Sequence, residues 1–212
     1  MQAVPLGDSA ITIVLGTERS TELLNRVHAT AATLAAEKLA MVQDIVPAYL
    51  GVTVFYDSLR ASYGEVAPKL LAICERATIS AIPDRIREHE IGVTYDGADL
   101  AQVSDSTGMS INEVVARHSG RSYTVDLLGF VPGFAYLSEL DPALQLPRRP
   151  QPRPRVPAGS VAIAGAQTAV YPLDTPGGWH IIGRTDSVMF DPSRDPPALL
   201  RAGDVVRFVA TP

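Results

Sequence analysis

The residues of this sequence best suited to binding chemistry are arginines gathered in one proline-rich stretch. Between residues 147 and 159 prolines alternate with Arg148, Arg149, Arg153 and Arg155. A guanidinium group can bind a carboxylate or phosphate through two parallel hydrogen bonds, and proline lowers the entropy cost of ordering the loop that carries it. The stretch therefore predicts an anion-binding loop. A solvated basic loop is an equally good interpretation of the same pattern.

A glycine-rich aromatic loop, residues 128–136, is the second candidate. Gly129 and Gly133 allow backbone shapes and close approaches that other residues resist. Such a loop can form the wall of a pocket and turn backbone N–H groups towards a ligand, although a packed corner of a β-barrel would look the same. Its candidate pocket residues are Phe130, Pro132, Gly133, Phe134 and Tyr136.

The third candidate stretch places an amide, a hydroxyl and the single tryptophan near a Gly-Gly pair. Gln167 and Thr168 could bind an amide or carboxylate group, and Trp179 could cover it. The alternative is a hairpin with Trp179 in the core. Two further candidates in this stretch are Tyr171 and Arg184.

His118 stands just before Gly120 at the expected end of a helix. Imidazole titrates near neutral pH, so His118 is a candidate acid or base. A helix C-terminus also favours a protonated histidine for purely structural reasons. The sequence leaves both interpretations open.

The sequence contains no motif of a self-sufficient enzyme. Neither Lys38 nor Lys69 follows a glycine as a P-loop requires, there is no His-Glu-x-x-His or paired-cysteine metal motif, and no Gly-x-Ser-x-Gly elbow is present. No metal site is predicted. If the protein serves catalysis, part of the machinery is expected on other chains.

Composition narrows the class of protein. The 212 residues are 46% hydrophobic and 19% charged with a net charge of −5, which argues against disorder and against general nucleic-acid binding. No apolar run reaches the ~20 residues of a membrane span, and the N-terminus lacks the features of a signal peptide. With a single cysteine as well, the sequence predicts a cytoplasmic protein.

Periodic patterns predict an α+β fold for the first part of the chain. Alternating apolar residues predict strands at 11–15, 42–46 and 51–56, and three- and four-residue spacing predicts helices at 20–39 and 62–76. Both helices are expected on one face of an antiparallel sheet. Ser20 and the box Ser62-x-x-Glu65 would begin the helices, Tyr63 would face inwards with the other apolar residues, and Cys74 would be a buried apolar residue.

The rest of the chain reads as β-rich. A domain boundary is expected near residue 83, which divides the chain into 1–83 and 84–212. Two short helices are predicted, one capped by Asp99 and ending before Gly108, the other running from Ser110 to Gly120. Strands are expected at 91–95, 123–130, 160–171, 179–185 and 205–209, and a closed or half-closed barrel would bury them.

These stretches together resemble one family. The carriers are residues 128–137, reading Leu-Gly-Phe-Val-Pro-Gly-Phe-Ala-Tyr-Leu, with 147–149, 153, 156–161, 164–168, 176–179 and 182–185. They resemble the family of allophanate hydrolase subunit 1, which includes the B subunit of 5-oxoprolinase and the Kip inhibitor of a sporulation histidine kinase. The similarity covers nearly the whole chain. It implies a ferredoxin-like N-terminal region followed by a cyclophilin-like β-barrel domain.

The resemblance also implies a reaction and partners. A homologous subunit 2 and a third, substrate-handling subunit would join this chain in an ATP-driven opening of the 5-oxoproline lactam to L-glutamate, with ATP shared with or bound by the partners. The catalytic residues predicted on this basis are His118, Arg148, Arg153 and Gln167. The substrate-binding residues predicted are Phe130, Pro132, Gly133, Phe134, Tyr136, Arg155, Thr168, Tyr171, Trp179 and Arg184.

Two alternatives remain open from the sequence. The chain could serve an allophanate or urea-amide carboxylase-hydrolase system, or it could be a non-enzymatic inhibitor of a sensor histidine kinase. As a 5-oxoprolinase subunit, the isolated chain is expected to be inactive.

Overall fold

The computed structural model describes residues 1–77 and 87–212. The chain separates into two compact units, Met1–Arg85 and Ile86–Pro212. The predicted boundary at residue 83 lies outside the described residues. Within these residues no helix is long and apolar enough to cross a membrane.

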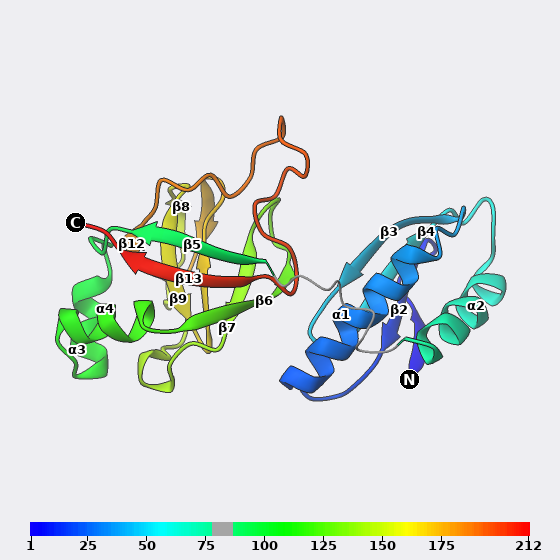
Figure 1. The fold of residues 1–212 in the computed structure, drawn as a ribbon, viewed down its shortest axis with the longest axis horizontal. Helices are drawn as coiled ribbons and strands as arrows, with labels where there is room; N and C mark the ends of the chain where they lie inside the picture. Colours follow the sequence, from blue (N-terminus) through cyan, green and yellow to red (C-terminus); the bar gives the residue numbers. More distant parts are fainter. Residues whose placement is uncertain (78–86) are drawn as a thin grey trace. The chain divides into compact units, whose positions relative to one another are not determined.

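The N-terminal unit is an antiparallel sheet packed against two helices (Figure 1). Its elements are β1 (Gln2–Pro5), β2 (Ala10–Val14), α1 (Thr21–Ala36), β3 (Val42–Pro47), β4 (Gly51–Tyr56) and α2 (Tyr63–Glu75). The strand order is β1-β2-β4-β3. All of these elements except β1 follow the sequence prediction. β1 was missed because it is a short, mostly exposed strand at the edge of the sheet and ends in a proline.

One face of this sheet carries the core. Ile11 and Ile13 of β2 are buried in one cluster with residues of both α1 and α2, and Val52 and Val54 of β4 belong to the same cluster. Alternate residues of a strand point to one face, so both helices cover the same face, as predicted. The prediction for Tyr63 was wrong. Its side chain is 38% exposed and its hydroxyl donates to the carbonyl of Ala3 at the edge of the sheet.

The predicted features of the two helices are present. The Ser20 side chain accepts from the Leu23 N–H, and Ser62 and Glu65 form the capping box. Cys74 is buried, and burial raises its pKa to about 11. A thiol held in its protonated form is a poor nucleophile, so Cys74 is a packing residue.

The C-terminal unit is built around a seven-stranded sheet with the order β12-β9-β10-β7-β6-β13-β5. β8 and β11 form a separate two-stranded antiparallel sheet. The strands are β5 (Glu88–Val93), β6 (Ser122–Leu128), β7 (Ala135–Ser138), β8 (Arg153–Val156), β9 (Ser160–Ala164), β10 (Gln167–Val170), β11 (Thr175–Gly177), β12 (His180–Arg184) and β13 (Val205–Ala210). The stretch 160–171, predicted as strand, is a hairpin that turns at Gly165.

The two edges of this sheet meet, so the sheet is a nearly closed barrel. Thr94, just after β5, and Arg184, at the end of β12, exchange both backbone hydrogen bonds at 2.9 Å. A Cβ atom on Gly183 would lie 2.7 Å from the Thr94 carbonyl oxygen, so this close approach requires glycine. The sheet that the sequence predicted as closed or half-closed is joined at this seam.

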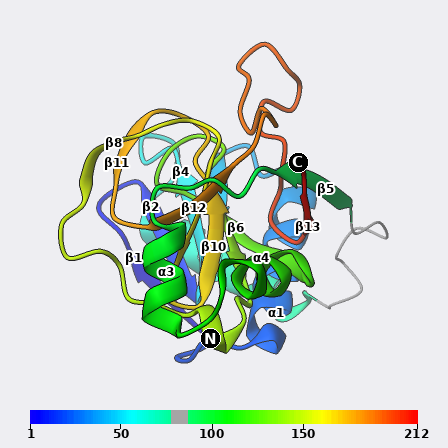
Figure 2. The same cartoon turned by 90° about the vertical axis from the view of Figure 1, so that its left-hand side faces the viewer.

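Two helices lie together at one end of this unit (Figures 1 and 2), α3 (Leu100–Thr107) and α4 (Ile111–Ser119). Leu100, Val103 and Val114 join the core of the barrel. Ser110 and Glu113 form the predicted capping box. Asp99 occupies the N-cap position of α3 as predicted, but its side chain makes no cap hydrogen bond and its carboxylate is engaged elsewhere.

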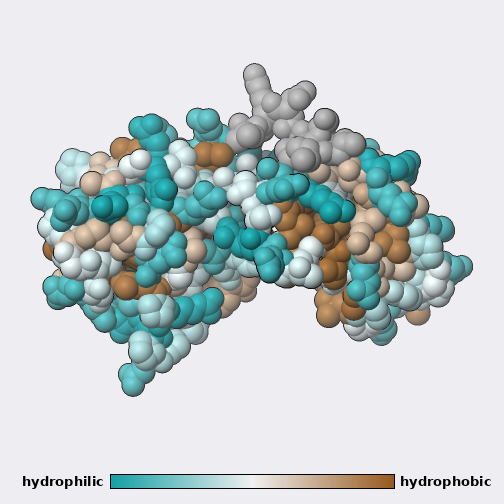
Figure 3. Space-filling view, turned by 90° about the horizontal axis from the view of Figure 1, so that it is seen from below, coloured by the Kyte–Doolittle hydropathy of each residue, from teal (hydrophilic) through white to brown (hydrophobic). Residues whose placement is uncertain are grey.

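Surface hydropathy differs between regions of the chain. On the side drawn in Figure 3, hydrophobic residues gather in one area of the N-terminal unit, whereas polar residues are interspersed across the C-terminal unit. Exposed large hydrophobic side chains of the N-terminal unit include Leu6, Phe55 and Leu59. In the C-terminal unit Phe130 is the most exposed of the large hydrophobic side chains that the structure describes, at 60%.

Candidate functional site

Four aromatic side chains from separate strands and loops of the barrel unit meet on one side of its sheet. Phe134 contacts Tyr136, Tyr171 and Trp179, with ring centroids 4.9, 5.3 and 5.7 Å away. Each contact is edge-on, a geometry that aromatic quadrupoles favour. The sequence placed these four residues in two unconnected stretches, and the structure brings them together. We call this group the aromatic cluster.

The loop that leads into the cluster depends on its glycine. Gly133 has a φ of +78°, and a Cβ atom there would lie 2.6 Å from Phe190 Cβ. Any other residue at this position would be strained, as the sequence suggested. Phe130 has a φ of +70° and its ring packs on Phe134 while most of its surface stays exposed. The loop therefore continues the cluster to the protein surface.

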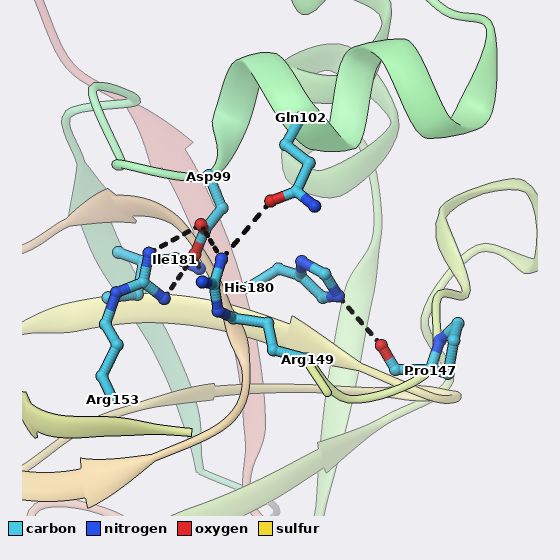
Figure 4. A network of polar contacts seen from close by, with 7 residues as sticks. All are labelled: Asp99, Gln102, Pro147, Arg149, Arg153, His180 and Ile181. Carbon is cyan, nitrogen blue, oxygen red and sulfur yellow. Dashed lines mark hydrogen bonds and ion pairs between the residues drawn. The ribbon is translucent and has the colours of Figure 1, made fainter. Parts of the chain in front are cut away.

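A charged network lies at the rim of the barrel (Figure 4). Arg149 Nη1 donates to Asp99 Oδ1 at 2.5 Å, and Arg153 donates from Nη1 and Nη2 to the two carboxylate oxygens at 2.9 and 2.7 Å. The backbone N–H of Ile181 donates to Asp99 Oδ2 at 2.7 Å. Asp99 is buried, and both arginine side chains are about three-quarters buried. We call this group the rim network.

The rim network keeps Asp99 ionised. Burial alone would raise the pKa of Asp99, but hydrogen bonds from Arg153 and from the Ile181 backbone, together with the charges of Arg153 and Arg149, hold it below its ordinary value. Two guanidinium groups face one carboxylate, so the network carries a net positive charge. Gln102 adds a neutral acceptor for Arg149 at 3.3 Å.

The four predicted anion-binding arginines are in three different situations. Arg149 and Arg153 are committed to Asp99, and Arg155 pairs with Asp174, where 77% of its side chain remains exposed. Arg148 is exposed and has no ion pair among residues 1–77 and 87–212. Its charge acts on the hydroxyls of Tyr136 and Tyr171 in the aromatic cluster. Arg148 is thus the arginine of this loop that is available to a ligand.

His118 lies in the interior of the barrel, away from solvent. It is fully buried and stacked on Phe208 at 4.7 Å between ring centroids. The Thr168 hydroxyl donates to the Ala162 carbonyl, so it accepts from His118 Nε2–H at 2.8 Å, and Nδ1 accepts from the Tyr95 hydroxyl at 2.7 Å. Burial lowers the pKa of His118 to about 3, so the ring is neutral at physiological pH. This geometry favours a structural role over acid–base catalysis.

The predicted pairing of Gln167 with Thr168 around one ligand group is not what β10 provides. Neighbouring residues of a strand point to opposite faces. Thr168 faces the interior and is fully buried against His118, whereas Gln167 is only half-buried. Arg184 lies at the barrel seam with its guanidinium on Asp96 at 2.8 Å, outside the contacts of the aromatic cluster.

Sequence reasoning missed two residues that hold the site together. Asp99 looked like a helix cap, and His180 was one of several scattered histidines. His180 is buried, and its Nε2 donates to the Pro147 carbonyl at 2.9 Å. The arginine cluster itself could have pointed to a residue such as Asp99, because a buried arginine needs a carboxylate partner.

The fold and the rim site define a two-unit α+β protein with a barrel that presents arginines and aromatic side chains. Residues 1–200 match the model of the family described as carboxyltransferase domain, subdomain C and D. The chain belongs to this family.

The relatives of the chain agree with this assignment. It is 38% identical to the B subunit of 5-oxoprolinase from Bacillus subtilis (strain 168), over 98% of this chain and 92% of the relative. It is 41% identical to the B subunit of 5-oxoprolinase from Escherichia coli O157:H7, over 96% and 93%.

Solved structures are similar as well. The crystal structure of TTHA0988 superimposes with a TM-score of 0.86 at 41% identity over 97% of this chain, which spans 40% of that longer chain. Kluyveromyces lactis urea carboxylase matches with a TM-score of 0.76 at 16% identity, over 99% of this chain and 22% of that chain, and this likeness shows the fold alone.

Proposed function

We propose that this chain is a subunit of an ATP-dependent 5-oxoprolinase, which opens the lactam ring of 5-oxoproline to give L-glutamate together with partner subunits. The observation that carries the proposal is 37–41% identity, over nearly the full length of both chains, to three proteins named as the B subunit of 5-oxoprolinase. The chain is an enzyme subunit in this view and is inactive alone. Because the reaction consumes ATP, we place it in the cytoplasm.

The chemistry needs activation and charge stabilisation. A lactam is a poor electrophile, so transfer of the ATP γ-phosphoryl group to its carbonyl oxygen prepares the ring carbon for attack by water. The ring C–N bond then breaks, the nitrogen takes up a proton, and a second water releases phosphate and glutamate. Both 5-oxoproline and the phosphorylated species are anionic, which suits a positively charged rim.

Within this chain we assign substrate contact to Arg148 and the aromatic cluster. Arg148 is exposed and its charge acts on the hydroxyls of Tyr136 and Tyr171, so its guanidinium group is available to a carboxylate or phosphoryl oxygen. Arg153 instead supports the loop through Asp99. Gln167, half-buried on β10, is a further candidate for the amide of the substrate.

Partner subunits supply what this chain lacks. We propose a homologous subunit 2 and a third, substrate-handling subunit, with ATP bound by these partners or shared with them. In the described residues no cluster of three potential ligands could hold a metal ion, so any catalytic metal would come with the nucleotide or a partner.

We propose that the two units have the fold details that the family resemblance implied. We propose domains 1–83 and 84–212, the first ferredoxin-like and the second a cyclophilin-like barrel. In support of the first, β2-α1-β3-β4-α2 follows the order of that fold, and β1 pairs with β2 at the edge where its last strand would lie. In support of the second, the seven-stranded sheet of the other unit closes at Thr94 and Arg184.

The test is glutamate release from 5-oxoproline and ATP. Three samples are compared: this chain alone, the partner subunits without it, and the full set. We expect activity only in the full set. An Arg148→Ala complex should lose most of it, whereas Arg117→Ala, which breaks an exposed pair with Asp141, should behave like the wild type. No activity in a set that assembles would instead favour a urea-derived amide substrate or a kinase-regulating role.

A further inference from the structure

Arg148 is flanked on both sides by residues that are fixed to the barrel. The Pro147 carbonyl accepts a hydrogen bond from His180 Nε2 at 2.9 Å, and the Arg149 N–H donates to the Gly178 carbonyl at 2.8 Å. Both partners lie beside Trp179 of the aromatic cluster. The backbone on either side of Arg148 is therefore held against residues 178–180.

The side chains of the same loop add a second anchor. Asp99 accepts three hydrogen bonds from Arg149 and Arg153 and one from the Ile181 backbone. A carboxylate has about four acceptor sites, so Asp99 is fully used by these contacts. Figure 4 shows the two guanidinium groups converging on Asp99 at the start of α3. The Ile181 contact joins this centre to β12, so the loop is tied to a barrel strand.

This arrangement separates two roles among neighbouring arginines. Arg149 turns towards Asp99, while Arg148 is exposed and acts on Tyr136 and Tyr171. A guanidinium group binds an anion best when little conformational freedom is lost on binding. Holding both neighbours of Arg148 reduces that freedom before the ligand arrives.

We propose that Asp99 is a positioning residue: through Arg149 and Arg153 it fixes the loop 147–153 so that Arg148 faces the anionic group of the substrate beside the aromatic cluster. His180 assists by holding Pro147. The identity of the substrate rests on the proposed function, but the fixing of the loop does not. The competing explanation is that the rim network only contributes to the overall stability of the barrel.

The chain offers a matched control for this question. Asp204 is also a buried carboxylate, held by Arg87, by His89 at 3.1 Å and by the Arg201 N–H at 2.8 Å. Arg87 precedes β5 and Asp99 follows it, so the two carboxylates lie towards opposite ends of that strand. Asp204→Asn should therefore destabilise the same unit without touching the loop 147–153.

Proteolysis of the isolated chain tests the loop directly. Trypsin cleaves after arginine but not before proline, so within 147–155 the first bond available to it is Arg148–Arg149. We expect Asp99→Asn to speed this cleavage about tenfold or more over both the wild type and Asp204→Asn, as the loss of charge-assisted hydrogen bonds predicts. The emission of Trp179, the single tryptophan, should shift in Asp99→Asn alone. Equal cleavage rates in Asp99→Asn and Asp204→Asn would overturn the proposal.

Kinetics of the full complex test the consequence for Arg148. Arg148→Ala and Asp99→Asn should each raise the KM for 5-oxoproline by about tenfold or more and change kcat less. Because Asp99 acts through Arg148, the double variant should be no worse than Arg148→Ala alone. Asp204→Asn should leave this KM unchanged. If the KM increases of the two single variants multiply in the double variant, Asp99 does not act through Arg148.

The glutamate-release assay and the trypsin cleavage assay test the two proposals independently. A wild-type complex that releases no glutamate would reject the proposed function, while the cleavage rates would still decide whether Asp99 fixes the loop. An active wild-type complex with unchanged cleavage in Asp99→Asn would reject the positioning role and leave the proposed function standing.

Discussion

The interior and the rim of the barrel bury titratable groups in opposite ways. In the interior, His118 is fully buried, accepts from Tyr95 and donates to Thr168, and stays neutral because burial lowers its pKa to about 3. At the rim, Asp99 is nearly as buried but stays charged, because arginines and a backbone amide hold its pKa below the ordinary range. His118 in the interior is therefore neutral, whereas Asp99 at the rim is ionised.

This difference separates structure from function. A neutral histidine with both ring nitrogens occupied has no proton to exchange near neutral pH and no solvent to exchange it with. The rim combines a net positive charge with an exposed arginine whose charge acts on the tyrosines of the aromatic cluster, which is suited to an anionic ligand. The chemistry that the sequence spread over both regions is therefore expected at the rim.

The largest effect should come from removing the interior histidine. His118→Ala would leave a cavity and strip the Tyr95 and Thr168 hydroxyls of a partner, so we expect a loss of about 3–4 kcal/mol in the free energy of unfolding. Urea unfolding of the isolated chain measures this loss. At a temperature where the variant remains folded, its complex should keep kcat/KM within about threefold. A stable variant that forms an inactive complex would show that His118 is needed for catalysis, as predicted from the sequence.

Acid should affect the interior before the rim. The folded pKa of His118 lies below its unfolded value of about 6.5, so its contribution to stability is complete above pH 6.5 and is lost as pH falls towards 3. Asp99 also has a lowered folded pKa, so its contribution is lost only below about pH 4.

We therefore expect the unfolding free energy of the wild type to fall by about 3 kcal/mol more than that of His118→Gln between pH 6.5 and 4. The other three histidines are present in both proteins, so the difference isolates His118. Urea titrations at each pH provide the values. Parallel curves would mean that the pKa of His118 is the same in the folded and unfolded chain and that the contrast with the rim is wrong.

A milder change probes the rim. Arg153→Lys keeps the charge but cannot form both of the hydrogen bonds that Arg153 makes to Asp99, so we expect a loss of about 1–2 kcal/mol in stability and a partial rise in KM. Arg117→Lys, at an exposed pair with Asp141, is the control and should have a smaller effect on both. If the two lysine variants behave alike, the fork geometry of the rim is unimportant.

The sequence predicted those parts of the molecule that depend on local patterns. The strands and helices of the N-terminal unit follow from their apolar spacing, and the capping boxes at Ser62 and Ser110 are local in the chain. Short strands were harder to predict. β1 and β7 are short, and β7 emerges from a glycine-rich loop that has no clear alternation.

The candidate site was predictable in its residue types but not in its partners. Arginine and aromatic stretches stand out in the sequence, and four of the aromatic residues do meet in the fold. Which arginine remains free depends on Asp99, which lies about fifty residues earlier and comes close only when β12 closes the barrel. The same kind of long-range contact buries His118 against Thr168.

The smallest effect should come from Arg155, an exposed arginine of the same stretch that is paired outside the rim network. Arg155 pairs with Asp174 in an exposed position, where solvent screens the interaction. Arg155→Ala should leave the urea midpoint unchanged, and glutamate release by the complex should stay within about twofold of the wild type. Arg148→Ala, seven residues earlier in the chain, should lose most activity. Arg155→Ala could instead raise KM as Arg148→Ala does. The substrate site would then extend along β8, as the sequence suggested, and would not be limited to Arg148, the arginine that Asp99 is proposed to position.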